Sequence, residues 1–210
     1  MPPSYPVTFS VDYPERELNR VSTFFRIFAV IPIAIIAGLL PGAELTGNLQ
    51  GGGADVSGTF TAGGLIFVPI VLMLLFTKKY PRWWFEWNLE LLRFLTRIGV
   101  YVALMDDEYP STDEQQAVHL HFTYPDAEQL SRGLPLVKWL LAIPHYIVLF
   151  FLYIGAFVTV IGAWFAILFT GRYPRGIFNF VEGVIRWHNR VVGYALVLVT
   201  DDYPPFRLSA

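Results

Sequence analysis

One stretch in the second half of the chain restricts the fold most strongly, because no residue between Lys138 and Arg172 carries a formal charge. One membrane helix needs about 20 predominantly apolar residues, and two helices joined by a turn need roughly twice that number. The stretch Trp139–Gly171 lies between these lengths. It predicts either two spans that recruit Leu134–Lys138, with the lysine snorkelling to the surface, or a short re-entrant hairpin that bends at Gly155 and is covered by protein.

Two apolar stretches in the first half, Val21–Leu40 and Phe60–Thr77, predict a second membrane hairpin. The segment between them is rich in glycine and has acidic but no basic residues, which indicates a loop. Basic residues gather at the other ends of the hairpins, so the positive-inside rule places both termini in the cytoplasm. The N-terminus lacks the pattern of a cleaved signal peptide, which predicts an uncleaved anchor.

The composition supports a membrane protein. Hydrophobic residues make up 54% of the 210 residues and charged residues only 15%, and the mean hydropathy is +0.47. Ordinary soluble domains have about 25% charged residues. The net charge of −2 argues against a nucleic-acid partner, and the absence of cysteine excludes disulfides, thiolate metal sites and cysteine nucleophiles.

The sequence contains an internal repeat. Val7–Pro14 matches Val118–Pro125, and Phe76–Arg82 matches Phe169–Arg175. Further matching pairs are Arg20 with Arg132, Arg26 with Lys138, Pro32 with Pro144, Arg93 with Arg186, Arg97 with Arg190, Tyr101 with Tyr194, and Tyr109 with Tyr203. The spacing between partners shortens across the glycine-rich segment, which indicates a loop insertion in the first copy. We therefore predict a first repeat at residues 1–112 and a second repeat at residues 113–210.

Each repeat reads as a strand, an apolar helical hairpin, an amphipathic interfacial helix and a second strand. Apolar and polar residues alternate in the opening strands, Val7–Val11 and Val118–Phe122. The predicted closing strands are Val100–Met105 and Gly193–Val199. Because two strands alone are marginal in water, we expect strands of both copies to pair into a small cytoplasmic sheet or sandwich. The predicted fold is a mainly α-helical integral membrane protein, with both repeats oriented alike about an axis along the membrane normal.

Four segments of the second copy carry a family resemblance: Leu141–His145, Phe169–Arg175, Arg186–Trp187 and Asp201–Phe206. With them, the chain resembles the bacterial membrane family catalogued as domain of unknown function 4389 (DUF4389), as two tandem copies. The resemblance implies a bacterial membrane protein, which we expect in the inner membrane. It implies no established activity and no catalytic residues. In the first copy Ile33 stands in the place of His145 and Lys78 in the place of Gly171.

A charged stripe on each amphipathic helix supplies the main candidate site. The candidate residues are Lys79, Arg82, Arg93 and Arg97 in the first copy and Arg172, Arg175, Arg186 and Arg190 in the second. One interpretation is ion pairing with glutamates at helical spacing, and the other is binding of lipid phosphates by helices that lie in the headgroup layer. If lipid phosphates are bound, the expected sites are the basic pairs around each Tyr-Pro, where a helix begins and its free N–H groups attract anions.

Three histidines are weaker candidates. His145 follows a proline inside the apolar stretch, and ionisable residues within a membrane are functional candidates by default. A structural hydrogen bond is the alternative, because isoleucine replaces it in the first copy. His119 and His121 share one strand face at a spacing seen among metal ligands, but a solvated strand face is the favoured interpretation, because Thr8 and Ser10 replace them in the first copy and no third ligand is identifiable.

No catalytic motif is found, and no cofactor or metal is expected. We therefore predict a non-enzymatic, lipid-associated scaffold or accessory subunit of a larger membrane assembly. Its expected partners are membrane lipids, especially anionic ones, and other membrane subunits or further copies of the chain. The alternatives are a small transporter or channel, and an enzyme that modifies lipid headgroups.

Overall fold

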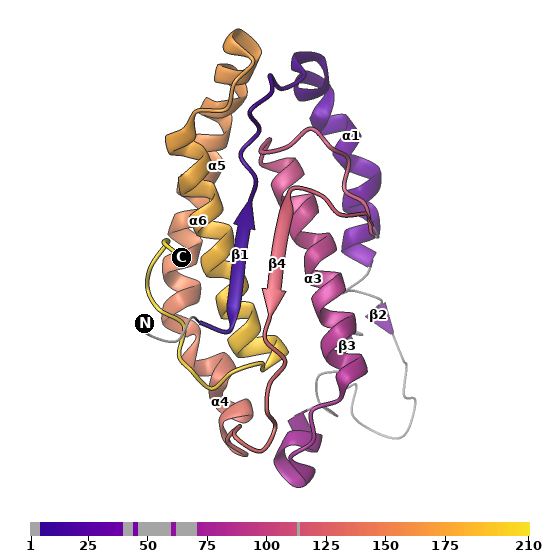
Figure 1. Cartoon of the computed structure of the whole chain (residues 1–210), viewed down its shortest axis with the longest axis vertical. Coiled ribbons are helices and arrows are strands. Elements are labelled where there is room, and N and C mark those ends of the chain that lie inside the picture. The colour runs from indigo at the N-terminus through magenta and orange to yellow at the C-terminus, as the bar shows by residue number, and fades with distance from the viewer. Residues whose placement is uncertain (1–4, 40–43, 46–59, 62–70, 113) are drawn as a thin grey trace, which may run out of the picture.

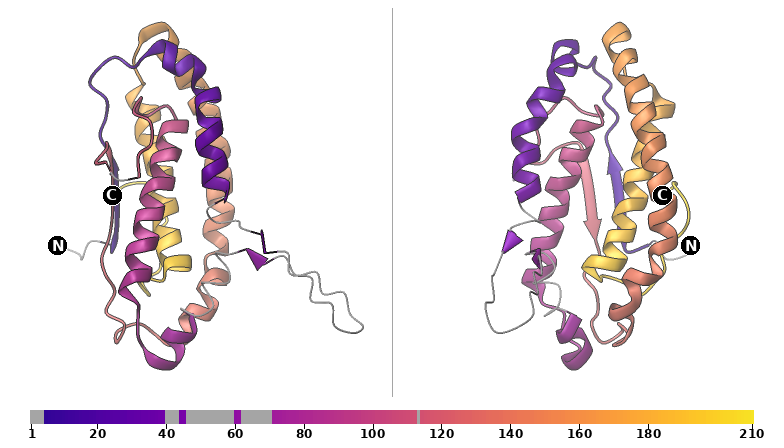
Figure 2. Two further views of the ribbon diagram at one scale, coloured as in Figure 1. Left: turned by 90° about the vertical axis from the view of Figure 1, so that its right-hand side faces the viewer. Right: turned by 180° about the vertical axis from the view of Figure 1, so that it is seen from behind.

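The computed structural model describes residues 5–39, 44–45, 60–61, 71–112 and 114–210. Its main elements form three layers (Figures 1 and 2). Strands β1 (Val7–Val11) and β4 (Val118–Phe122) form the first layer, helices α3 (Arg82–Val102) and α6 (Arg175–Val192) the second, and helices α1 (Arg20–Leu39) and α5 (Ile143–Thr170) the third. A short helix, α4 (Leu134–Leu141), precedes α5.

The two opening strands pair as predicted. They are antiparallel, with Phe9 opposite Leu120 at the centre of the register. Both strands alternate strictly, so that Val7, Phe9 and Val11 are buried while the residues between them are exposed. One sheet face therefore packs on the helices and the other faces outward.

The apolar stretch of the second repeat forms no hairpin, which corrects the prediction. Helix α5 runs unbroken through Gly155 to Thr170, and its 28 residues measure about 42 Å at 1.5 Å per residue. Gly155 does not bend the chain, because it lies against the ring of Phe180 where α5 packs on α6. A glycine in an apolar helix here marks a packing contact between helices.

The first apolar stretch is helical as predicted, since α1 covers Arg20–Leu39. Residues 71–77, at the end of the second stretch, are also helical. Two short strands, β2 (Glu44–Leu45) and β3 (Phe60–Thr61), pair antiparallel between them. The glycine-rich loop and most of the predicted second helix of this hairpin lie outside the described residues.

The predicted closing strands are wrong. Residues 100–102 form the last turn of α3, and Gly193–Val197 forms a π-helical turn, η1, that continues α6. Both helical runs end near a leucine with positive φ, Leu104 at 64° and Leu198 at 63°. Short apolar runs have the same composition in buried strands and buried helix ends, so periodicity alone could not separate them.

The two repeats interlock. Strand β1 of the first copy packs on α6 of the second, and β4 of the second copy packs on α3 of the first. Matching contacts recur, since the Tyr13 hydroxyl donates to the Tyr173 carbonyl and the Tyr124 hydroxyl donates to the Tyr80 carbonyl. The fold thus has an approximate twofold axis that passes through the sheet and the α3–α6 layer.

Candidate functional site

The outer helices expose an apolar surface that few soluble proteins show. We call it the apolar face, and it consists of Val21, Phe24, Phe25, Phe28, Ile31 and Ile35 on α1 with Leu136, Trp139, Leu140, Ile143, Ile147, Phe150, Phe151, Ile154, Phe157, Val158, Ile161, Phe165 and Phe169 on α4 and α5. Phe157 is 69% exposed. Large contiguous apolar patches mark membrane or protein contacts.

The apolar face carries no exposed charge. Arg26 is the single formally charged residue from Val21 to Leu39, and Lys138 is the single one from Leu134 to Thr170. Both side chains point inward, because Arg26 is 2% exposed and Lys138 is 0% exposed. Of the described residues, the helical run Leu134–Thr170 is long and apolar enough to cross a membrane, as judged by length and composition.

Arg26 joins α1 to the turn that follows α3. Its guanidinium donates to the Tyr101 carbonyl at 3.1 Å and to the Asp106 carbonyl at 2.6 Å, and it pairs with the Asp107 carboxylate. It also lies 4.4 Å from the centre of the Tyr101 ring. The backbone N–H of Asn19 donates to the same Asp107 carboxylate. This buried charge is therefore paired and hydrogen-bonded, as burial requires.

Lys138 repeats the arrangement in the second copy. Its ammonium group donates to the Thr200 carbonyl at 2.7 Å, lies 2.7 Å from Asp201, and faces the Tyr194 ring at 5.2 Å. The backbone N–H of Ser131 donates to Asp201. Burial opposes ionisation of this carboxyl, but the hydrogen bonds from Lys138 and Ser131 outweigh it and hold the pKa of Asp201 below its ordinary value.

Sequence reasoning missed these two ion pairs. It placed the lysine at the membrane surface, whereas the structure buries it against Asp201. The available signal was the repeat itself, because Arg26 matches Lys138 and both copies end in acidic residues before a Tyr-Pro. A cation and an acid that recur together at matching positions indicate a pair.

Four arginines of the charged stripe donate hydrogen bonds to the strand layer and to the segments that lie beside it. Arg93 donates to the Leu120 carbonyl on β4 at 3.0 Å, and Arg186 donates to the Phe9 carbonyl on β1 at 2.9 Å. Arg97 donates to the Ser111 carbonyl, and Arg190 donates to the carbonyls of Arg207 and Ser209 near the C-terminus. The predicted interfacial helices instead form the middle layer of the fold, and their arginines donate to the sheet and to the segments beside it.

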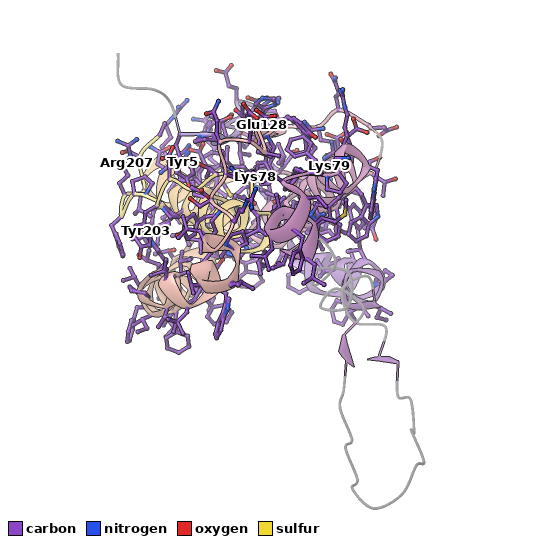
Figure 3. The ribbon with its side chains drawn as sticks, turned by 90° about the horizontal axis from the view of Figure 1, so that it is seen from below. Tyr5, Lys78, Lys79, Glu128, Tyr203 and Arg207 are labelled. Carbon is purple, nitrogen blue, oxygen red and sulfur yellow. The ribbon has the colours of Figure 1, made fainter. Side chains whose placement is uncertain are left out.

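The other four basic candidates divide into two groups at opposite ends of the molecule. Lys79 and Arg82 are exposed where α3 begins, and Arg172 and Arg175 are exposed where α6 begins. Arg82 pairs with Glu86 at 2.9 Å, and the Arg175 guanidinium lies 4.1 Å from the centre of the Tyr13 ring. Figure 3 looks onto the first end, where the Lys78 ammonium group donates to the Glu128 carbonyl at 2.9 Å. The structure brings each predicted pair together but keeps the two pairs apart.

His145 lies in an aromatic cluster. Its ring is fully buried, accepts a hydrogen bond from the Trp187 indole at 3.0 Å, and stacks on Phe206 with ring centres 4.0 Å apart. In the first copy Ile33 packs with Phe94 and Ile98. An apolar contact thus replaces the histidine–tryptophan pair, which favours the structural interpretation of His145.

His119 and His121 are exposed on the outward sheet face, and His119 lies 2.9 Å from Asp12. Within the part of the chain that the structure describes, no group of three His, Cys, Asp or Glu side chains is placed to hold a metal ion. One acidic residue before each Tyr-Pro, Asp107 or Asp201, pairs with a buried cation instead.

Comparisons with known proteins return one match. No curated protein and no solved structure matches the chain. The family match covers one copy, whereas the sequence pattern predicted two in tandem. The matched segment holds nearly all of α4, all of α5 and α6, and the His145 cluster. Residues 135–207 match the family described as "Domain of unknown function (DUF4389)".

Proposed function

We propose that this protein lies on a membrane through the apolar face and acts there as a non-enzymatic scaffold or accessory subunit. The observation that carries the proposal is the absence of exposed charge on the described side chains of α1 from Val21 onward, α4 and α5. Covering that surface with hydrocarbon removes apolar area from water at a gain of roughly 25 cal/mol per Å².

The layer order favours helices that lie in the membrane plane. The strands run alongside the helices at the middle of their length (Figures 1 and 2). If α5 crossed the bilayer, the outward sheet face with Thr8, Ser10 and His119 would sit at hydrocarbon depth, where open sheet edges are not tolerated. In the planar arrangement the sheet faces water and the apolar face enters the bilayer.

The planar arrangement agrees with the expectation that both ends of the chain lie on one side of the membrane. The described chain leads from Tyr5 directly into β1, and the C-terminal end lies near the sheet (Figure 2), so both belong to its aqueous side. We propose that this side is the cytoplasm of a bacterial cell. The approximate twofold axis then runs along the membrane normal.

Flotation with liposomes tests the membrane contact. Phe150→Glu with Ile154→Glu places two charges on exposed positions of α5, and Thr8→Glu with Ser10→Glu places two on the outward sheet face. A buried charge in the bilayer costs about 2.5–3.5 kcal/mol, so the α5 variant is expected to lose most of its binding and the sheet variant to keep it. Equal flotation of both folded variants would refute the proposal.

The basic pairs at the two ends are proposed to contact anionic headgroups. Arg172 and Arg175 are exposed, and Arg175 sits on an aromatic ring at the start of α6. Arg172→Glu with Arg175→Glu should lower binding to phosphatidylglycerol vesicles and leave binding to phosphatidylcholine vesicles unchanged. Unchanged binding to both would remove the headgroup contact from the proposal.

The role as an accessory subunit predicts a protein partner for the polar side of the molecule. Purification of the full chain from its native membrane in mild detergent, followed by mass spectrometry, should recover at least one other membrane protein in a fixed ratio. Recovery of the chain with lipids alone would contradict the accessory role and leave the membrane contact standing.

A further inference from the structure

A cleft of about 540 Å³ opens between α3, α5 and α6. We call it the central cleft. Its walls are mainly apolar and include Leu92, Ala156 and Val184, and its rim includes Phe157 of the apolar face. A second hollow of about 400 Å³ adjoins it and shares Phe157 and Val160. The volume is within the range of small-molecule sites, which is roughly 300–1,000 Å³.

Four side chains that line the central cleft carry polar groups, namely Thr96, Tyr153, His188 and Asn189. Thr96 and Asn189, which occupy matching positions in the two repeats, meet at 3.4 Å, and the Asn189 amide donates to the Ile185 carbonyl. The His188 ring packs edge-on against Tyr153 with centres 5.9 Å apart. Among the described residues, no hydrogen bond to the His188 ring is found.

Burial lowers the pKa of His188. The ring is therefore neutral at pH 7 and offers one N–H donor and one nitrogen acceptor. The lining includes no lysine, arginine, aspartate or glutamate. A ligand head in this cleft would meet hydrogen-bonding groups without a counter-ion, which disfavours phosphate and carboxylate heads because an unpaired charge is costly to bury.

We propose that the central cleft binds the acyl chain of a lipid with an uncharged ester or hydroxyl head, and that this head meets His188 and Thr96. The inference rests on the proposed function, because the cleft opens beside the apolar face and would take its ligand from the bilayer. Apolar walls hold the chain, and the polar residues fix the orientation of the head.

The probes are 1-oleoylglycerol and oleate, which share one acyl chain and differ in the charge of the head. The full-length protein in mild detergent is mixed with each, and native mass spectrometry counts the retained molecules. We expect one 1-oleoylglycerol per chain and weaker retention of oleate. Failure to retain 1-oleoylglycerol, or tighter binding of oleate, overturns the proposal.

Two glycines provide a matched pair of variants. A side chain added at Gly99, which lines the cleft, or at Gly162, which does not, meets no atom within 4 Å at its Cβ position. Gly99→Phe should fill the cleft and lose the probe, whereas Gly162→Phe should retain it. Retention by a folded Gly99→Phe variant at the wild-type level refutes the site.

His188→Leu tests the head contact, because Leu95 holds the matching position in the first copy and shows that leucine fits this helix. Loss of one hydrogen bond should weaken 1-oleoylglycerol binding by about three- to tenfold, while oleate binding stays the same. Equal binding of 1-oleoylglycerol by this variant and the wild type contradicts the assigned head position.

Flotation separates this inference from the proposed function. Gly99→Phe is expected to float with liposomes like the wild type, because the apolar face is intact. A wild-type protein that floats but retains no 1-oleoylglycerol refutes the cleft alone, and one that fails to float refutes the membrane contact.

Discussion

Two single residues, Arg26 and Lys138, make matching contacts in the two halves of the chain. Arg26 and Lys138 differ in chemistry, yet each is buried, each pairs with an aspartate, and each faces a tyrosine ring. Desolvating a charge is costly unless geometry and additional hydrogen bonds compensate it. Here the carbonyl of Asp106 after α3 and the carbonyl of Thr200 after η1 supply such bonds, so each cation ties an outer helix to the turn behind it.

The Asp201 pair predicts a pH dependence of stability. Because the pKa of Asp201 is lowered on folding, its contribution is complete above the ordinary value of 3.8 and is lost as the pH falls through the lower folded value. Asp201→Asn should therefore destabilise the protein most at neutral pH, and the difference from wild type should shrink below pH 3.8. Thermal unfolding followed by circular dichroism in detergent measures this, and a constant difference down to acid pH would contradict it.

Lys78 predicts a stabilising substitution. Its φ is 49°, whereas Gly171 holds the matching position with φ 73°. The left-handed conformation costs a non-glycine residue roughly 1–2 kcal/mol, and glycine avoids that cost at some loss of entropy. Lys78→Gly should raise the free energy of unfolding by about 0.5–1 kcal/mol.

The reverse change serves as its control. Gly171→Lys should destabilise the protein, since a Cβ there lies 3.3 Å from the Glu17 carboxylate and the backbone is left-handed. A lower melting temperature for Lys78→Gly would show that the Lys78 hydrogen bond to the Glu128 carbonyl outweighs the backbone strain.

At the scale of elements, the middle helices support the sheet with arginines. A two-stranded sheet is marginal on its own, so β1 and β4 depend on the helices beneath them. Arg186 reaches the Phe9 carbonyl and Arg93 reaches the Leu120 carbonyl, directly opposite each other in the register. The charged stripe of the sequence is thus used to join layers.

This role predicts a local effect of Arg186→Met. Hydrogen bonds to charged groups contribute about 1.5–3 kcal/mol each, so the variant should expose the amides of β1 to faster hydrogen exchange. Arg82→Met is the control, because the Arg82–Glu86 pair is exposed and contributes little. Equal protection of residues 7–11 in both variants would show that Arg186 does not stabilise β1.

Strands with strict alternation were predictable, and buried helix ends were not. Val7–Val11 shows two distinct faces because one side meets water. Val100 and Tyr101 are buried beside the exposed Val102, and Gly193–Val197 is buried except at Leu196, so these short apolar runs show no regular alternation that reveals the period. The predicted bend at Gly155 failed for a related reason, since an apolar glycine suits a turn and a helix contact equally.

At the scale of the whole molecule, the layer order predicts which side of a membrane each end of α5 contacts. The chain has no cysteine, so one introduced cysteine is labelled uniquely. Arg132→Cys and Arg172→Cys place one at each end of the run Leu134–Thr170, on exposed positions. A helix in the membrane plane makes both reactive from the same side.

Sealed vesicles and a membrane-impermeant maleimide measure this. Both variants should label to the same extent before the vesicles are opened. Labelling of one variant only from the opposite side would mean that α5 crosses the bilayer, and the planar arrangement would then be wrong.

The sequence by itself determined the apolar helices α1 and α5 and the alternating strands β1 and β4, because each is a local pattern of side chains along the chain. It also contained the partners of both buried ion pairs, at matching positions in the two copies. Only the tertiary structure decided that β1 lies on α6 and β4 on α3, that Arg93 and Arg186 face the sheet, and that α5 is continuous through Gly155. Those outcomes depend on which distant surfaces bury the most apolar area while satisfying every buried charge, a balance that no local pattern records.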